Sequence, residues 1–374
     1  MQRRRFLRKA AAGAVAASTA TGLAACGGSA EGAGEGGPNI NARPTVRWRL
    51  ASSFPRSLDT IYGAAEKLSE TLEELTDGRF QMRVYPAGEL VPGTEVLDAA
   101  QKGTVQCAHS ASYYFIGKDP TLAFDCAVPF GLTARQQSAW LYSSGMELMR
   151  ERFADFNVLN FPGGNTGTQM GGWFRREINS VADLNGLKMR IPGLGGQVMD
   201  RFGVSVQLIT GGEIYQALER GAIDAAEWVG PYDDIKLGFD QVASYYYYPG
   251  WWEPGPGLSF YVNREAWDKL PAGYQAAFTA AARVADQAMM TGYDAKNPAA
   301  LAELKQKGSV ELRRFSDEIL QAAQREAFAL MEETAAGDAG YRKVFEAWKQ
   351  FREDSYAWFS LAENGYSGFA LQNV

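Results

Sequence analysis

The hydrophobic and polar positions between residues 187 and 228 alternate in blocks that predict strands and helices in turn. Apolar and basic residues alternate over 187–192 as far as a proline, which cannot donate a hydrogen bond to a sheet, so this run predicts a short strand. The blocks that follow predict a helix over 193–202, a strand over 204–208, a helix over 213–220 and a strand over 225–228. Strands that alternate with helices in this way are typical of a parallel sheet.

Two polar features fall where these predicted strands end. Arg190 closes the first strand, and the pair Glu227 and Trp228 closes the last one. In parallel sheets, ligands bind beyond the carboxyl ends of the strands. An arginine at such a place presents a planar fork of N–H donors that suits a carboxylate. The pattern therefore predicts a carboxylate-binding site anchored by Arg190.

The same alternation recurs in the rest of the chain. Apolar spacing predicts strands at 46–50, 80–84, 105–108, 258–262 and 310–313, and helices over 61–75, 94–102, 271–307 and from 316 onward. The roughly 330 residues after the N-terminal segment exceed one compact core, so two α/β lobes are expected. A helix over 271–307, at about 1.5 Å per residue, would reach across both lobes. The aromatic run 245–252 is interpreted either as the wall of a site or as a buried strand followed by a packed turn.

Three motifs carry a resemblance to a known family. They are the run 187–192 followed by Gly203, the run 213–227, and the loop 85–90 with its Pro-x-Gly-x-Leu pattern. Together they resemble the extracytoplasmic solute-binding subunits of tripartite ATP-independent periplasmic (TRAP) transporters, over about 46–307. The resemblance implies a two-lobed, type II-like periplasmic-binding-protein fold with a long hinge-spanning helix. It also implies a binding subunit that hands its ligand to a membrane permease and is not an enzyme.

We expect the following division of the chain. Lobe 1 is predicted to comprise 44–166 and about 256–295, lobe 2 to comprise 167–255 and about 296–330, and a C-terminal helical tail to cover 331–374. A glycine-rich run around Asn165 suits the first crossover between the lobes, because glycine lets backbone segments approach closely. The tail is rich in aromatic residues, and in the 2-oxo acid subgroup of the family such a terminal helix is exchanged in a dimer. The resemblance therefore implies a homodimer through this helix.

Similarity to the 2-oxo acid subgroup implies the residues of the site. The ligand would be a small 2-oxo or 2-hydroxy monocarboxylate such as pyruvate, and its expected contacts are Arg190, Gln169, Asn165 and Tyr114. A Na⁺ or Ca²⁺ ion would bridge protein and ligand through the side chains of Gln169 and Glu227 and the carbonyl of Trp228, with Glu253 as a further ligand. These are hard oxygen donors, which both cations accept.

Two observations bear on this ligand set. Many family members carry an asparagine where this chain has Trp228, and the departure argues against the sugar-acid and dicarboxylate subgroups. We expect Arg190 to balance the ligand carboxylate, which would leave Glu227 as a buried anion that needs a cation. The alternative interpretation is that Glu227 only forms an ion pair with Arg190.

Composition limits the enzymatic alternatives. The chain has one histidine, His109, and three cysteines, which excludes zinc sites built from several His or Cys ligands. No nucleophile elbow, phosphate loop or dinucleotide fingerprint is found. The strongest enzymatic alternative is a secreted hydrolase that uses Glu227 and Glu253 as an acid pair. Another alternative is a TRAP binding subunit for a dicarboxylate or a sugar acid.

The N-terminal segment predicts export. Residues 1–26 combine a basic head with an apolar run, resembling a twin-arginine signal that ends in a lipobox at Cys26, and 27–43 is typical of a flexible linker. The protein is therefore expected in the periplasm, lipid-anchored through Cys26 or, alternatively, cleaved by the ordinary signal peptidase. Losing the five basic residues of the signal would change the formal net charge from −6 to −11, which argues against nucleic acid as a partner. Cys107 and Cys126 have apolar flanks, which favours buried thiols over a disulfide.

Overall fold

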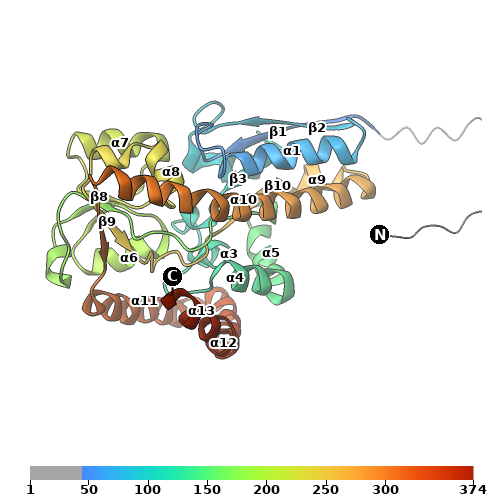
Figure 1. The fold of residues 1–374 in the computed structure, drawn as a ribbon. Helices are drawn as coiled ribbons and strands as arrows, with labels where there is room; N and C mark the ends of the chain where they lie inside the picture. Colours follow the sequence, from blue (N-terminus) through green and yellow to red (C-terminus); the bar gives the residue numbers. More distant parts are fainter. Residues whose placement is uncertain (1–43, 374) are drawn as a thin grey trace, which may run out of the picture. The chain divides into compact units, whose positions relative to one another are not determined.

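The computed structural model describes residues 44–373, and the strands in this part of the chain form two separate sheets (Figure 1). The first sheet has the strand order β2-β1-β3-β10-β4, and the second has the order β11-β9-β5-β8-β6-β7. Each sheet with its covering helices makes one lobe, which confirms the expected two-lobed α/β class. The predicted export signal and linker, 1–26 and 27–43, lie outside the described residues.

The first sheet is built from two separate stretches of the chain. Its strands are β1 (Val46–Ser52), β2 (Phe80–Tyr85), β3 (Cys107–Ser110), β4 (Val158–Asn165) and β10 (Gly257–Asn263). β1 pairs in parallel with β2 and β3, whereas β10 returns from the second lobe and runs antiparallel between β3 and β4. The sequence did not predict β4, because Pro162 and two glycines interrupt its alternation. An edge strand tolerates such a proline, and β4 lies at the edge.

Helices cover the first sheet and bury one face each. In α1 (Gly63–Leu75) the buried positions Ala64, Ala65, Leu68 and Leu72 recur at helical spacing, as the sequence predicts. The other helices are α2 (Val96–Gln101), α3 (Ala123–Cys126), α4 (Ala134–Trp140), α5 (Met146–Ala154) and α9 (Arg264–Asp268), with 3-10 turns at Gly93–Glu95, Ser112–Phe115 and Pro120–Leu122 and a π-helical turn at Leu141–Gly145. The helices between 123 and 154 had not been predicted.

The second sheet contains the segment from which the sequence argument started. Its strands are β5 (Trp173–Phe174), β6 (Lys188–Arg190), β7 (Ser205–Gln207), β8 (Ala225–Ala226), β9 (Tyr245–Tyr248) and β11 (Glu311–Arg314). Its helices are α6 (Gly193–Arg201), α7 (Gly211–Glu219) and α8 (Pro231–Lys236), with 3-10 turns at Val181–Leu184 and Phe239–Gln241. β6 pairs in parallel with β7 and β8, as predicted, while β5 runs antiparallel to β8 and β9.

The aromatic run 245–252 is a buried strand and a packed turn. Tyr246 and Tyr247 in β9 are almost fully buried, and Trp251 and Trp252 pack into the core of the second lobe. Tyr247 stacks against Phe315 with ring centroids 4.8 Å apart. The interpretation of this run as the wall of a site is therefore wrong for these residues.

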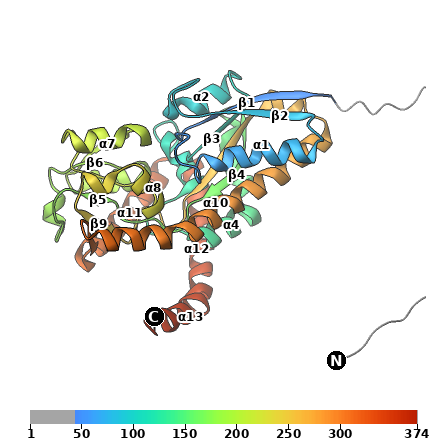
Figure 2. The same ribbon diagram turned by 45° about the horizontal axis from the view of Figure 1, so that its top comes forward.

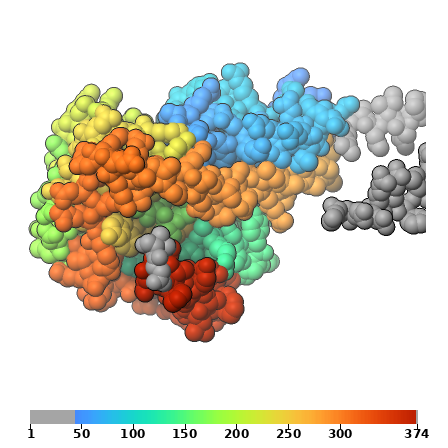
Figure 3. Space-filling model, viewed as in Figure 1, coloured from blue at the N-terminus to red at the C-terminus, as the bar shows by residue number. Residues whose placement is uncertain are grey.

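The long helix α10 (Ala272–Lys307) joins the two lobes. It packs against α1 of the first lobe and against α8 of the second, and Figure 3 shows it in orange crossing this face from one lobe to the other. Its 36 residues correspond to about 54 Å at 1.5 Å per residue. The helix ends at Gly308, which has a φ of 65° and thus adopts the left-handed conformation that favours glycine. The predicted hinge-spanning helix is confirmed.

The C-terminal segment continues with α11 (Asp317–Gly337), α12 (Ala339–Leu361), α13 (Glu363–Ala370) and a 3-10 turn at Leu371–Asn373. α11 packs on α6 of the second lobe. The first half of α12 buries Tyr341, Val344, Phe345 and Trp348 against Phe124 in the first lobe. In Figure 2, α13 stands clear of the two sheets. Half of the aromatic tail thus packs on its own lobe.

The cysteines and the histidine of the described chain are core residues. Cys107 and Cys126 are buried and free, in agreement with the expected thiols. His109 in β3 is fully buried, its Nε2 lies 3.2 Å from the carbonyl oxygen of Gly163, and its ring packs against Phe54 and Phe260. Among residues 44–373, no helix has the length and apolar character needed to cross a membrane.

His109 should stay neutral in the folded protein at pH values where an exposed histidine is charged. Burial lowers its pKa to about 3, although the contact with Gly163 acts in the opposite direction. The unfolded chain binds a proton below the ordinary pKa of 6.5 and the folded chain does not. The contribution of His109 to the free energy of unfolding is therefore full above pH 6.5 and is lost as the pH falls toward 3, by about 1.4 kcal/mol per pH unit. NMR of the single imidazole should show no titration between pH 8 and about 4.5, while the urea-unfolded chain titrates near its ordinary value. A midpoint near 6.5 in the folded protein would contradict this.

Candidate functional site

Arg190 is the last residue of β6 and is only 1% exposed. Hydrogen bonds from each guanidinium nitrogen fix its orientation. Its Nε donates to the carbonyl of Ile209 at 3.1 Å, and its Nη2 donates to the hydroxyl of Tyr114 at 3.3 Å. Its Nη1 donates both to the carbonyl of Glu227 at 3.1 Å and to the carboxylate of the same residue. The guanidinium carbon also lies 5.1 Å from the ring centroid of Trp228. These bonds fix the guanidinium and use four of its five N–H groups, which leaves one N–H of Nη2 for a further acceptor.

Glu227 is the first residue beyond β8 and is fully buried. β6 and β8 are neighbours in register, with Arg190 opposite Ala226, so the next residue lies beside the arginine. The ion pair of Glu227 with Arg190, which the sequence left open as an alternative, is present, because sheet pairing brings together residues that are far apart in sequence. One carboxylate oxygen is bonded to Arg190, but Oε2 has no hydrogen-bond partner among the described residues. Burial raises the pKa of Glu227 to about 7, with Arg190 acting in the opposite direction.

A second buried carboxylate, Glu253, lies close enough to Arg190 and Glu227 for their charges to shift its pKa. Its Oε2 accepts a hydrogen bond from the hydroxyl of Tyr113 at 3.1 Å. Burial and the charge of Glu227 raise the pKa of Glu253 well above its ordinary value, while Arg190 acts in the opposite direction. The carbonyl of Glu253 accepts from the backbone N–H of Gln169 at 3.2 Å, which ties the two lobe-connecting segments together.

Gln169 contributes a second unpaired oxygen. Its side chain is 4% exposed, and its Nε2 donates to the hydroxyl of Thr166 at 3.1 Å. Its Oε1, like Oε2 of Glu227, is buried without a partner among the residues described. Unpaired buried oxygens cost free energy, and a hard cation removes that cost by taking oxygen donors of this type. The donor set therefore fits Na⁺ or Ca²⁺.

The charge balance also favours a cation. The raised pKa values of Glu227 and Glu253 show that Arg190 alone does not stabilise both as anions, and a bound ligand carboxylate would add a further negative charge. No cluster of three or more His, Cys, Asp or Glu side chains that could hold a metal ion occurs within residues 44–373. A cation would therefore depend on amide, carbonyl and ligand oxygens as well as carboxylates. Coordination by the carbonyl of Trp228 stays a prediction.

A small cavity lies in front of Arg190 between the lobes. Its volume is about 10 Å³, far below the roughly 300–1,000 Å³ typical of drug-sized ligands, so the lobes would have to part to admit even a small molecule. The side chains around it combine a few polar groups with a mainly apolar wall: Arg190, Gln169, Thr166, Tyr113, Tyr114, Trp228, Phe54, Ile61, Ala111, Val229 and Leu258.

The predicted site residues occupy three kinds of position. Arg190, Gln169, Tyr114 and Trp228 line the cavity, and Glu227 and Glu253 lie behind it, bonded to lining residues. Asn165 is not among the lining residues. Its amide donates to the carbonyl of Gly255 at 3.0 Å and accepts from the N–H of Gly167 at 2.8 Å, so it fixes the crossover between the lobes. Direct ligand contact by Asn165 stays a prediction.

The apolar wall of the cavity is not predicted from the sequence. Phe54, Ile61 and Leu258 come from the first lobe and carry no polar signal that distinguishes them from other core residues. Tyr113 had a signal, because it stands next to Tyr114 after a predicted strand. Either tyrosine could have been chosen from the sequence, and the structure uses both.

Asp234 holds the segment that follows Glu227. It is almost fully buried and accepts hydrogen bonds from Trp173 Nε1 at 2.9 Å and from the Tyr246 hydroxyl at 2.7 Å. It also accepts from the backbone N–H groups of Val229 at 3.3 Å and Gly230 at 3.1 Å. Burial raises the pKa of Asp234 to about 7 while these donors lower it. Asp234, held by Trp173 and Tyr246 of the second sheet, thus fixes the backbone around the Trp228 carbonyl.

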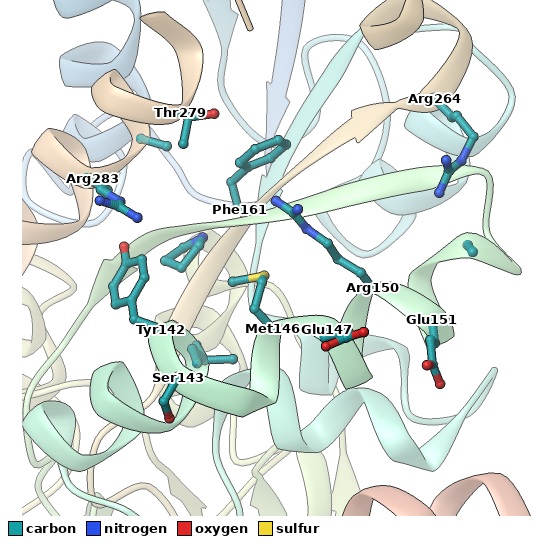
Figure 4. Close-up of a pocket in the computed structure, with 14 residues that line it drawn as sticks. Tyr142, Ser143, Met146, Glu147, Arg150, Glu151, Phe161, Arg264, Thr279 and Arg283 are labelled. Atoms are coloured by element: carbon teal, nitrogen blue, oxygen red, sulfur yellow. The ribbon is translucent and has the colours of Figure 1, made fainter. Parts of the chain in front are cut away.

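A larger groove lies on the first lobe, away from these residues. It has a volume of about 700 Å³ and is lined by α5, β4 and α10 (Figure 4). Figure 4 shows Phe161 and Met146 in its middle, with Arg150, Arg264 and Arg283 around them. The groove contains none of the strand-end residues described above. We therefore assign the ligand site to the smaller, enclosed cavity.

Two lobes that are joined by a continuous helix and closed over a small cavity define the class of solute-binding proteins. Residues 51–338 match the family described as bacterial extracellular solute-binding protein, family 7. The match covers most of the chain, and the chain belongs to this family. The resemblance stated from the sequence is thereby confirmed. The hydrolase alternative with Glu227 and Glu253 finds no support, since the family binds solutes.

Individual relatives agree with this placement. The monocarboxylate 2-oxoacid-binding periplasmic protein of Nostoc sp. is 56% identical over 328 residues, which are 87% of this chain and 90% of that protein. A solved structure of a TRAP transporter solute-binding protein from Bordetella bronchiseptica is 46% identical to this chain, with a TM-score of 0.87, and the match covers 88% of this chain and 98% of that chain. That structure is a mixed-occupancy dimer with calcium and picolinate in its active site. A TRAP solute-binding protein from Pseudoalteromonas atlantica, with sodium and pyruvate bound, is 42% identical with a TM-score of 0.83, covering 86% and 98%.

Replacement of Arg190 should test the buried pair. Arg190→Met leaves the Glu227 carboxylate buried without its donor, and breaking a buried pair at one end costs about 3–5 kcal/mol. We expect a loss of that size in the free energy of unfolding, measured with urea at pH 8 after chelator treatment. The double variant Arg190→Met/Glu227→Gln should lose less, because no charge is left unpaired, and Arg190→Lys serves as the charge-retaining control. Single and double variants with simply additive losses would contradict a direct pair.

Proposed function

We propose that this protein captures a small 2-oxo or 2-hydroxy monocarboxylate such as pyruvate, together with a Na⁺ or Ca²⁺ ion, and delivers the acid to a TRAP membrane permease. One observation carries the proposal. The fixed Arg190 guanidinium lines a small cavity between the lobes, beside two buried oxygens, on Gln169 and Glu227, that have no hydrogen-bond partner among the described residues. These groups are the complement of a carboxylate and of a hard cation, respectively.

Different residues would bind the ligand carboxylate and the cation. Arg190 and the Tyr114 hydroxyl would bind the ligand carboxylate, since both residues line the cavity and are bonded to each other at 3.3 Å. Gln169, Glu227, Glu253 and the Trp228 carbonyl would hold the cation. A cation supplies a second point of attachment for an oxygen next to the carboxylate. The favoured ligands therefore carry a 2-oxo or 2-hydroxy group.

The lining favours a monocarboxylate over the alternative ligands. Arg190 is the one basic residue that lines the cavity, and the rest of the wall includes Phe54, Ile61 and Leu258. A dicarboxylate would place its second charge against this apolar wall, and a sugar acid would leave several hydroxyl groups unpaired there. The 2-oxoacid and pyruvate ligands of the relatives described above support the same choice.

The division into lobes and the export route also belong to this proposal. The strands support crossovers between β4 and β5 and between β9 and β10, in line with lobe 1 at 44–166 and 256–295 and lobe 2 at 167–255 and 296–330. Helix α10 is continuous across the boundary near 295. The boundary therefore marks the point at which the helix passes from the first lobe to the second, not a break in the helix. Export to the periplasm with a lipid anchor at Cys26 would keep the protein near its permease.

Binding of pyruvate should require the cation. After chelator treatment and dialysis into a choline buffer free of sodium and calcium, we expect calorimetry to show at least about tenfold weaker pyruvate binding, equivalent to about 1.4 kcal/mol. Restoring Na⁺ or Ca²⁺ should restore the affinity. Propionate is the matched control ligand, because it lacks only the 2-oxo oxygen and should bind weakly with or without the cation. Succinate and sialic acid test the other ligand classes.

Two outcomes would count against this mechanism. Unchanged pyruvate affinity without any cation, with Glu227→Gln equal to the wild type, would reduce the site to Arg190 and hydrogen bonds. Absence of binding by pyruvate, 2-oxobutyrate and lactate alike would exclude the proposed ligand class.

We further propose that the protein forms a homodimer through its C-terminal helices. Several large apolar side chains near the end of the described chain are strongly exposed: Trp358 is 62% exposed, Leu361 79%, Tyr366 74% and Leu371 73%. They lie on the second half of α12, on α13 and on the turn that follows, and in Figure 2 α13 projects from the body. Such a surface favours burial against a second copy. The dimer of the Bordetella bronchiseptica relative supports this arrangement.

A charged residue on this surface should disrupt the dimer. We expect Leu361→Glu to be monomeric in sedimentation velocity, because the carboxylate would be buried unpaired at the interface. Leu75→Glu is the matched control, since Leu75 is 50% exposed at the end of α1 on the first lobe, and this variant should stay dimeric. A monomeric wild type, or a dimeric Leu361→Glu variant, would refute the C-terminal interface.

A further inference from the structure

Three side chains converge on the carboxylate of Asp59, which lies in the loop between β1 and α1 of the first lobe. The hydroxyl of Tyr232 donates to both carboxylate oxygens, at 3.1 and 3.0 Å, and Lys236 donates to one of them. Lys296 donates to the other oxygen at 3.0 Å and to the hydroxyl of Thr60 at 3.0 Å. We refer to Asp59, Tyr232, Lys236 and Lys296 as the Asp59 cluster.

The cluster connects parts of the chain that belong to different lobes. Tyr232 and Lys236 lie on α8, which follows β8 and precedes β9, and both strands belong to the second sheet. Lys296 lies on α10. The Asp59 loop belongs to the first lobe. Its contact with α8 therefore crosses from one lobe to the other.

The three donors form one rigid group. Tyr293 on α10 donates its hydroxyl to Asp233 on α8 at 2.6 Å, and the N–H of Tyr232 donates to the side-chain oxygen of Asn297 at 3.1 Å. The ring of Tyr232 lies beside both ammonium groups, with its centroid 4.2 Å from Lys236 Nζ and 4.7 Å from Lys296 Nζ. Relative motion of the lobes would therefore separate Asp59 from this group as a whole.

Asp59 has no place in the cavity itself. It is not among the lining residues, whereas Ile61, two positions further along the same loop, is one of them. Partial burial alone would raise the pKa of Asp59, but hydrogen bonds from Lys236, Lys296 and Tyr232 lower it to about 2. The carboxylate is thus ionised at every physiological pH and is held by donors that do not touch a ligand.

We propose that Asp59 is a positioning residue for ligand capture: the Asp59 cluster fastens the two lobes in the closed state and slows ligand release. The proposal rests on the proposed function, because it requires that the lobes close over a ligand. A contact that exists only in the closed state raises the population of that state and lowers the apparent dissociation constant accordingly. Single exposed ion pairs contribute little, but three donors share one carboxylate here.

The test compares Asp59→Asn with a matched control. Asp98→Asn removes the same charge from another partly exposed ion pair, the 2.8 Å contact with Lys118, which lies entirely within the first lobe. We expect Asp59→Asn to raise the dissociation constant for pyruvate by about threefold to tenfold, through a faster off-rate in stopped-flow fluorescence. The factor should be the same for 2-oxobutyrate, since the cluster touches neither ligand. Asp98→Asn should bind both as the wild type does.

A second variant separates folding defects from loss of the contact. Lys236→Gln removes a donor from the opposite lobe and should raise the off-rate in the same way, and the double variant Asp59→Asn/Lys236→Gln should add little to Asp59→Asn. Choline chloride at fixed calcium should weaken pyruvate binding in the wild type more than in Asp59→Asn, because salt screens the cluster.

The outcomes are distinct. A wild type that binds pyruvate, with both single variants equal to Asp98→Asn, would overturn the Asp59 proposal and leave the proposed function intact. A wild type that binds no 2-oxo acid would instead overturn the proposed function.

Discussion

A buried arginine next to a buried carboxylate is the constraint on which the rest of this structure depends. Arg190 and Glu227 are both about 1% exposed or less, and charges at such depth are tolerated only when every neighbour is arranged around them. The parallel register of β6 and β8 brings them together, and the Asp234 network fixes the backbone just beyond. The Tyr114 hydroxyl approaches the guanidinium from the first lobe. The anchor is therefore complete only when both lobes contribute to it.

This dependence on both lobes gives the closed cavity its chemistry. Each lobe supplies what the other lacks, with the charged groups on the second lobe and most of the apolar wall on the first. An apolar wall lowers the local dielectric constant, which strengthens the electrostatic contacts to an anion. The same loop of the first lobe presents Ile61 to the cavity and Asp59 to the outside. Selection of the ligand and stabilisation of closure are thus placed only two residues apart.

The sequence allowed the second lobe to be predicted in more detail than the first. The blocks between 187 and 228 have the clear periods of strands and helices, and strand ends in a parallel sheet meet at one edge, which placed Arg190 and Glu227 together. The strand β4 and the helices between 123 and 154 lack such periods because glycine, proline and short turns interrupt them. The apolar wall depends on contacts between distant segments. Local patterns do not encode such contacts.

The direct bond between Arg190 and Glu227 shows a different limit of sequence reasoning. The main interpretation of the sequence gave the two residues separate partners, a ligand carboxylate for Arg190 and a cation for Glu227, and kept their direct ion pair only as the alternative. Distance along the chain was the wrong measure, because sheet register and not sequence separation decides which side chains meet. The unpaired oxygens of Gln169 and Glu227 could be recognised only with coordinates, because being unpaired is a property of the surroundings and not of the residue type.

The packing of α12 affects how the chain folds during synthesis and where it can be truncated. The family match ends at residue 338, yet Tyr341, Val344, Phe345 and Trp348 lie in the same core as Phe124 of the first lobe. The segment needed for folding therefore extends beyond the segment that matches the family. During synthesis the first lobe cannot complete its core until nearly the last residues have left the ribosome, although most of its strands are made early. A fragment that stops at the family boundary would expose this aromatic surface and should aggregate, even though it contains every residue of the binding site.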